Sequence, residues 1–181
     1  KISPFEFGRA EFQISYERYF NNRKSSVSIV PSVFLRDNEQ ERASGWQLMS
    51  QYRFYLTHFN GEADRIFLGL YNVGFYTGIY GLYLDYTEDF VRGKYNPINS
   101  EYEMQTYSKT INSFEGGPLL GVQIDITKRI LIDFFVGGGI RWSDYTNSYT
   151  DEIENFGSFG VFDAEYTGVK PKLGFTIGIT I

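Results

Sequence analysis

The chain has 181 residues, of which 19% are aromatic and 22% charged, with a formal net charge of −5 at pH 7 and no cysteine. The negative charge excludes the electrostatic footprint of a nucleic-acid-binding protein, and the lack of cysteine excludes disulfides and thiolate metal sites. The 15 Tyr, 17 Phe and 19 Gly indicate an all-β protein, because aromatic residues favour strands and glycine accompanies strand bends. The length fits a single domain covering 1–181.

Apolar and polar side chains alternate along most of the chain, which is the period of a strand whose two faces meet different surroundings. Near the start, Phe5 and Phe7 lie on one face and Glu6 on the other. At the end, the apolar residues from Leu173 to Ile181 alternate with Gly, Thr and Lys. The alternation predicts eight strands, at 2–8, 11–20, 27–35, 46–56, 66–85, 113–126, 130–142 and 172–181.

The fifth predicted strand contains an uncharged stretch, 66–84, that is long enough for a transmembrane helix. Four Gly and four Tyr in this stretch disfavour an isolated helix, so a long barrel strand is the preferred interpretation.

Connections of two lengths alternate along the chain, and only the tight corner at 8–10 breaks the pattern. Those at 21–25, 57–65 and 127–129 are short or moderate, whereas those at 36–45, 86–112 and 143–168 are longer. Short turns at one end and long loops at the other are typical of an outer-membrane barrel whose termini face the periplasm. The predicted fold is therefore an all-β, eight-stranded, antiparallel up-and-down transmembrane barrel with short periplasmic turns and longer extracellular loops.

Alternation does not say which face is outside, and a soluble lipocalin-like barrel would place its apolar face inward. The polar face here is poor in Lys and rich in Gly, Gln, Ser and Tyr, unlike a typical soluble surface. Trp46 and Trp142 near one end of the apolar face, with Phe20 and Phe54 near the other, favour a membrane. A charge network inside the barrel is predicted from Glu11, Glu17, Arg53, Glu115, Asp125, Asp133 and Arg141.

Four segments carry a resemblance to a known family: ISYERYF (14–20), YRFYL (52–56), LLGVQIDITKRILIDFFVGGG (119–139) and LGFTIGITI (173–181). They resemble the eight-stranded outer-membrane barrels of the OmpA, OmpX and OmpW type, and most closely the small, uncharacterised outer-membrane barrels of Bacteroidota. The resemblance implies residence in the outer membrane of a Gram-negative bacterium and says nothing about an activity. The terminal Ile181 departs from the aromatic residue usual at the end of such barrels.

No catalytic, cofactor-binding or metal-binding residue is predicted. The single histidine, His58, lies in a predicted turn and is interpreted as a solvated residue rather than a catalytic base. Aromatic side chains in the long loops are candidates for contact with a partner, or for packing on one another where strands extend past the membrane. These loop aromatics are Tyr95, Tyr102, Tyr107, Tyr145, Tyr149, Phe156, Phe159 and Phe162.

Three functions remain open from the sequence. The first is a non-enzymatic structural or protein-interaction barrel, as an accessory subunit of a larger outer-membrane complex. The second is an OmpW-like barrel that binds or transports a small molecule, although eight strands enclose space for little beyond their own side chains. The third is a lipid-modifying barrel enzyme. The lipid bilayer is an expected partner in all three.

Overall fold

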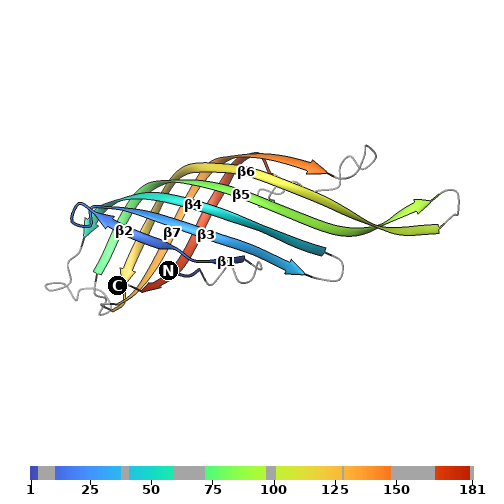
Figure 1. Ribbon diagram of the computed structural model, residues 1–181. Helices are drawn as coiled ribbons and strands as arrows, with labels where there is room; N and C mark the ends of the chain where they lie inside the picture. Colours follow the sequence, from blue (N-terminus) through green and yellow to red (C-terminus); the bar gives the residue numbers. More distant parts are fainter. Residues whose placement is uncertain are drawn as a thin grey trace.

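The computed structural model describes residues 1–3, 11–37, 41–58, 72–96, 101–127, 129–147 and 166–179. Eight antiparallel strands form one strongly curled sheet (Figure 1). The strands are β1 (Glu11–Gln13), β2 (Tyr16–Phe20), β3 (Ser25–Asp37), β4 (Glu41–His58), β5 (Asn72–Asn96), β6 (Glu101–Asp125), β7 (Ile130–Asn147) and β8 (Gly168–Ile179). The described part of the chain contains no helix that is long and apolar enough to cross a membrane.

Strands β3 to β8 pair in sequence order, while β1 and β2 lie end to end beside β3. The sequence predicts one strand over 11–20, and the structure interrupts it at Ile14 and Ser15. Opposite the interruption lies Pro31, whose carbonyl oxygen accepts a hydrogen bond from the Ile14 amide at 3.2 Å. Proline has no N–H to donate in return, so the ladder loses a bond at this point.

Two of the predicted shorter connections, at 21–25 and 127–129, are found as turns, whereas residues 57 and 58 of the third lie in β4 and residues 59–65 lie outside the described residues. The turn between β2 and β3 contains residues with positive φ, namely Asn21, Asn22 and Arg23. Asparagine tolerates this backbone conformation well. Between β6 and β7, the Thr127 hydroxyl accepts hydrogen bonds from the amides of Arg129 and Ile130.

Two of the predicted long loops are wrong, because the flanking strands continue through them. Residues 36–45 lie mostly in β3 and β4, and residues 86–112 lie mostly in β5 and β6. Strands β5 and β6 stay in register from Asp85↔Asn112 to Asn96↔Glu101 and project past their neighbours as a two-stranded hairpin (Figure 1). Residues 148–165 of the third predicted loop lie outside the described residues.

Most of the first predicted strand, 2–8, also lies outside the described residues, but Ile2 is placed between the two edges of the sheet. Ile2 forms an antiparallel bridge with Ile14 on one side and with Ile177 of β8 on the other. Its amide donates to the Ile177 carbonyl oxygen at 2.7 Å, and the Ile177 amide donates to the Ile2 carbonyl oxygen at 2.9 Å. Segment 1–3 and the last residues of β8 lie at the same end of the sheet as the β2–β3 turn (Figure 1).

The two faces of the sheet differ sharply in composition. Large apolar side chains on the outer face are exposed, including Val136 at 57% and Leu120 at 59%. The inner face combines a packed cluster of large side chains with buried charges. The inner packed cluster contains Val30, Met49, Tyr55, Tyr76, Tyr80, Leu82, Leu84, Leu119 and Phe135.

An aromatic row crosses four strands on the outer face. Tyr83, Phe114 and Trp142 are successive register partners on β5, β6 and β7. The Tyr83 and Phe114 rings are 4.8 Å apart between centroids, and the Trp46 ring of β4 lies 5.2 Å from that of Tyr83. Phe20 and Phe54 lie on the same face toward the short-turn end. Aromatic side chains therefore lie toward both ends of the exposed apolar face.

Candidate functional site

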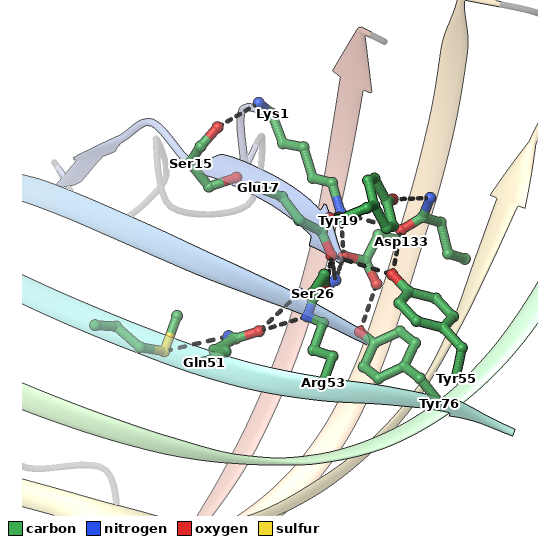
Figure 2. A network of polar contacts seen from close by, with 12 residues as sticks. Lys1, Ser15, Glu17, Tyr19, Ser26, Gln51, Arg53, Tyr55, Tyr76 and Asp133 are labelled. Atoms are coloured by element: carbon green, nitrogen blue, oxygen red, sulfur yellow. Dashed lines mark hydrogen bonds and ion pairs between the residues drawn. The ribbon is translucent and has the colours of Figure 1, made fainter. Parts of the chain in front are cut away.

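Four charged side chains from four parts of the chain meet on the inner face (Figure 2). Arg53 of β4 contacts Asp133 of β7 at 2.6 Å and Glu17 of β2 at 3.4 Å. The Lys1 ammonium contacts the same two carboxylates, reaching Asp133 at 2.8 Å and forming an ion pair with Glu17. All four side chains are at most 5% exposed, so we call them the buried charge ring.

Polar neighbours orient each member of the ring (Figure 2). The Tyr76 hydroxyl donates to Asp133 at 2.6 Å, and the Tyr55 hydroxyl donates to Glu17 at 3.1 Å. The Gln51 side-chain oxygen accepts from two nitrogens of Arg53, at 2.9 Å and 2.7 Å. The Arg53 guanidinium also lies 4.6 Å from the centroid of the Tyr76 ring. A buried ionic group is tolerated when its charges are paired and hydrogen-bonded in this way.

The ring is also balanced in charge, with two cations facing two carboxylates. This balance matters because moving a charged group from water into a low-dielectric interior costs free energy. Pairing that group with an opposite charge recovers most of the cost. The ring ties β2, β4 and β7 to segment 1–3, and these elements are far apart in the sequence. It therefore fixes how distant strands face each other across the inside of the sheet.

A second ion pair lies further along the inner face. Arg141 of β7 contacts Glu115 of β6 at 2.6 Å, and the Tyr80 hydroxyl donates to Glu115 at 2.8 Å. The Lys172 ammonium of β8 lies 3.9 Å from Glu115 and 5.8 Å from the Tyr80 ring centroid. This group again joins strands through charges that point away from the outer face.

The predicted charge network is thus divided between two groups. Glu17, Arg53 and Asp133 meet in the buried charge ring, and Glu115 meets Arg141 in the second pair. Glu11 is buried on β1, and Asp125 is half-buried at the end of β6. The prediction omitted several polar members of these two groups. The omitted residues are Lys1, Gln51, Tyr55, Tyr76, Tyr80, Gln123 and Lys172.

Glycines on the inner face make room for this packing. A Cβ atom on Gly139 would lie 2.6 Å from the Tyr80 hydroxyl oxygen, and one on Gly121 would collide with the Tyr76 ring. A Cβ atom on Gly178 would lie 2.5 Å from the Cγ of Lys1. The tyrosines and the lysine that hold the carboxylates therefore occupy space that glycine leaves free.

The structure places some of the predicted loop aromatics in strands, and the others lie outside the described residues. Tyr107 and Tyr145 lie in strands rather than loops, because β6 and β7 continue past the aromatic row. Tyr107 is buried, whereas Tyr145 is exposed and its ring lies 5.0 Å from the Lys109 ammonium. Tyr95 and Tyr102 are register partners near the tip of the β5–β6 hairpin. Tyr149, Phe156, Phe159 and Phe162 lie outside the described residues.

Within the described ranges, no group of three or more His, Cys, Asp or Glu side chains is arranged to hold a metal ion. The backbone of His58 pairs with Gly74 at the end of β4.

No family model, curated protein or solved structure matches the chain. What the structure shows is an all-antiparallel, strongly curled sheet of eight strands.

Proposed function

We propose that this chain is an integral outer-membrane β-barrel with a filled interior, which acts as a structural or protein-interaction subunit and has no enzymatic activity of its own. One observation carries the proposal. Charged side chains such as Arg53 and Asp133 are buried inside the curled sheet, while large apolar side chains such as Val136 and Leu120 are exposed outside it.

A water-soluble protein has the opposite arrangement, because exposing a continuous apolar surface to water is unfavourable and promotes aggregation. Hydrocarbon removes that penalty for the outer face. It also explains why the charges lie inside, since an ionic group facing lipid has no partner. The outer face is thus suited to lipid, with the buried charge ring shielded from it.

The dimensions of the outer face suit a bilayer. On β7 the exposed apolar face runs over 12 residue steps, from Ile130 to Trp142. At about 3.3 Å per residue and a strand tilt of roughly 40–45°, this length spans about 28–30 Å of membrane. The hydrocarbon core of a bilayer is about 30 Å thick, and aromatic side chains favour its two interfaces.

Closure of the sheet into a barrel is part of the proposal. In lipid, each edge of an open sheet would leave unpaired N–H and C=O groups, at a cost of several kcal/mol for each group. Segment 1–3 forms backbone bonds with both edges, to Ser15 on one side and to Ile177 on the other. It therefore supplies a position between β1–β2 and β8 through which the sheet can close.

The interior of such a barrel is filled rather than open. The buried charge ring, the pair Glu115–Arg141 and the inner packed cluster together occupy the inside of the sheet. This packing favours a structural or interaction role over an OmpW-like transport role. Short turns and the chain ends would face the periplasm, and the β5–β6 hairpin would face the outside of the cell.

The element best placed to contact another protein is the end of this hairpin, residues 91–96 and 101–108, which we call the arm. Strand β4 pairs with β5 only as far as Phe90, and β7 pairs with β6 only from Lys109. In the described part of the chain, residues 91–96 of the arm pair with residues 101–106, and the outer edges of these two stretches are candidates for pairing with another strand. Met104 of the arm is 73% exposed.

The interaction role is tested by trimming the arm. Residues 91–106 are replaced by Asn-Gly, a favoured two-residue hairpin turn, so that the register partners Phe90 and Tyr107 close a shorter hairpin. We expect the full-length protein, extracted gently from its native membrane, to elute with a stoichiometric partner, and the trimmed protein to elute alone. Elution of both proteins as lone monomers would contradict a partner-binding role for the arm.

A further inference from the structure

Segment 1–3 is attached to the sheet by few backbone bonds. The Ser15 amide donates to the Lys1 carbonyl oxygen at 2.8 Å, and Ile2 exchanges two bonds with Ile177. The Ser3 hydroxyl donates to the Phe175 carbonyl oxygen at 3.1 Å. By comparison, β7 and β8 are in register along the whole length of β8, from Gly168 to Ile179. Between the two edges of the sheet, the described residues thus form a short contact region, in which segment 1–3 lies between Ser15 and Ile177 and which we call the seam.

The Lys1 side chain adds a different kind of tie across this seam (Figure 2). Its ammonium contacts Glu17, which belongs to β2 on one side, and Asp133, which belongs to β7 beyond β8 on the other. It also donates to the Gln123 side-chain oxygen at 3.3 Å. One cation therefore holds two carboxylates that lie on opposite sides of the seam.

Without the Lys1 charge, the ring would contain two buried carboxylates and one guanidinium. Arg53 already contacts both carboxylates, so it has no further charge to offer. The hydroxyls of Ser15, between β1 and β2, and of Thr176, on β8, flank segment 1–3; they are buried and make no hydrogen bond among the described residues. They do not replace the ammonium, and an excess negative charge in a low-dielectric interior is strongly unfavourable.

We infer that Lys1 is an electrostatic latch: docking of segment 1–3 into the seam is controlled by the charge of Lys1 against Glu17 and Asp133. This inference rests on the proposed closure of the barrel through segment 1–3. According to this inference, the buried charge ring becomes neutral at the same moment as segment 1–3 closes the seam, because Lys1 enters the ring only when the segment docks. When Lys1 leaves the ring, the edges of β2 and β8 lose their common neighbour.

Closure itself is tested with a cysteine pair in this cysteine-free chain. Ile2→Cys and Ile177→Cys fall at a hydrogen-bonded antiparallel pair, where Cα atoms are about 5.5 Å apart and a disulfide can form. Both side chains point outward and are exposed, by 47% and 43%. We expect mild oxidation of the folded protein to link the pair. Failure to link would contradict closure, and with it the proposed barrel.

The latch is tested separately by hydrogen exchange on Lys1→Met in the otherwise native chain. We expect the seam amides of Ser15 and Ile177 to exchange about tenfold faster or more, while amides between β4 and β5 keep their protection. Lys24→Met, at an exposed turn, is the matched control and should leave the seam unchanged. Unchanged seam exchange in Lys1→Met would overturn the latch, even where the disulfide forms.

A rescue variant separates charge from side-chain packing. Adding Glu17→Gln to Lys1→Met leaves one carboxylate opposite Arg53 and restores the balance of charge. We expect this double variant to recover seam protection, and to recover folding if Lys1→Met alone fails to fold. A double variant as open as the single one, or as poorly folded, would contradict an electrostatic role for Lys1.

Discussion

Replacement of Arg53 by methionine is expected to lower the free energy of unfolding by about 3–5 kcal/mol, the usual cost of removing one partner from a buried ion pair. Arg53 is 2% exposed and is the cation shared by Glu17 and Asp133. Methionine fills much of the same volume but leaves the two carboxylates with Lys1 alone. It also leaves the Gln51 side-chain oxygen without its two donors. Urea titration of the protein folded into vesicles measures the loss.

Arg42→Met is the matched control, because Arg42 also contacts an aspartate but lies on the surface. Its pair with Asp37 is 3.7 Å long, and the two side chains are 71% and 77% exposed. Exposed ion pairs contribute about 0–1 kcal/mol, so this variant should unfold almost like the parent. Equal, small losses in the two variants would mean that the interior is hydrated and that the buried charge ring does not support the fold.

The second large effect is expected on the opposite face. Val136→Arg should lower the free energy of unfolding in a bilayer by about 2–4 kcal/mol, the cost of an arginine near the midplane on the lipid face of a barrel. Val136 is 57% exposed and lies midway between Ile130 and Trp142 on β7. The same substitution on a water-facing strand would cost little, because exposed arginine is well hydrated. Reversible urea unfolding in vesicles measures the difference.

Thr146→Arg provides the control for this variant. Thr146 is exposed on the same face of β7, but it lies past Trp142 and so outside the expected hydrocarbon region. Its substitution should cost about 0–1 kcal/mol, as found near the interfaces of such barrels. If Val136→Arg is no more costly than Thr146→Arg, the outer face does not contact hydrocarbon.

The sequence predicted that charges such as Arg53, Glu115 and Asp133 share one face of the sheet, because the alternation of a strand is strict. Arg53, Glu115 and Asp133 all point inward, opposite the exposed residues beside them. Which charges meet was beyond prediction, since that depends on the register between strands and on their stagger around the sheet. Lys1 was missed for a related reason: it precedes the first predicted strand, 2–8, and nothing in the sequence indicated that its ammonium would lie between β2 and β7.

The ends of the strands were harder to predict than their faces. Residues 86–112 are rich in charged and polar side chains, which suggested a loop. Polarity reports contact with water, whereas strand pairing depends on backbone bonds, and these continue wherever cross-strand neighbours are compatible. The hydroxyls of Thr87 and Thr110 are 3.2 Å apart, and Lys94 is the register partner of Glu103. The interruption of the strand at Ile14 was not predicted, because its cause is Pro31 on the neighbouring strand β3 rather than a residue of the interrupted strand.

The most direct test of the central claim is the depth of the two tryptophans, Trp46 and Trp142, in a bilayer. Trp46→Phe and Trp142→Phe leave one tryptophan each, and lipids brominated at different positions along the acyl chain quench fluorescence according to depth. Both residues belong to the outer aromatic row, so we expect strong quenching by lipids brominated near the headgroup and weaker quenching by those brominated near the chain end. Absence of quenching at every depth, with the protein folded and associated with the vesicles, would contradict a membrane-spanning barrel.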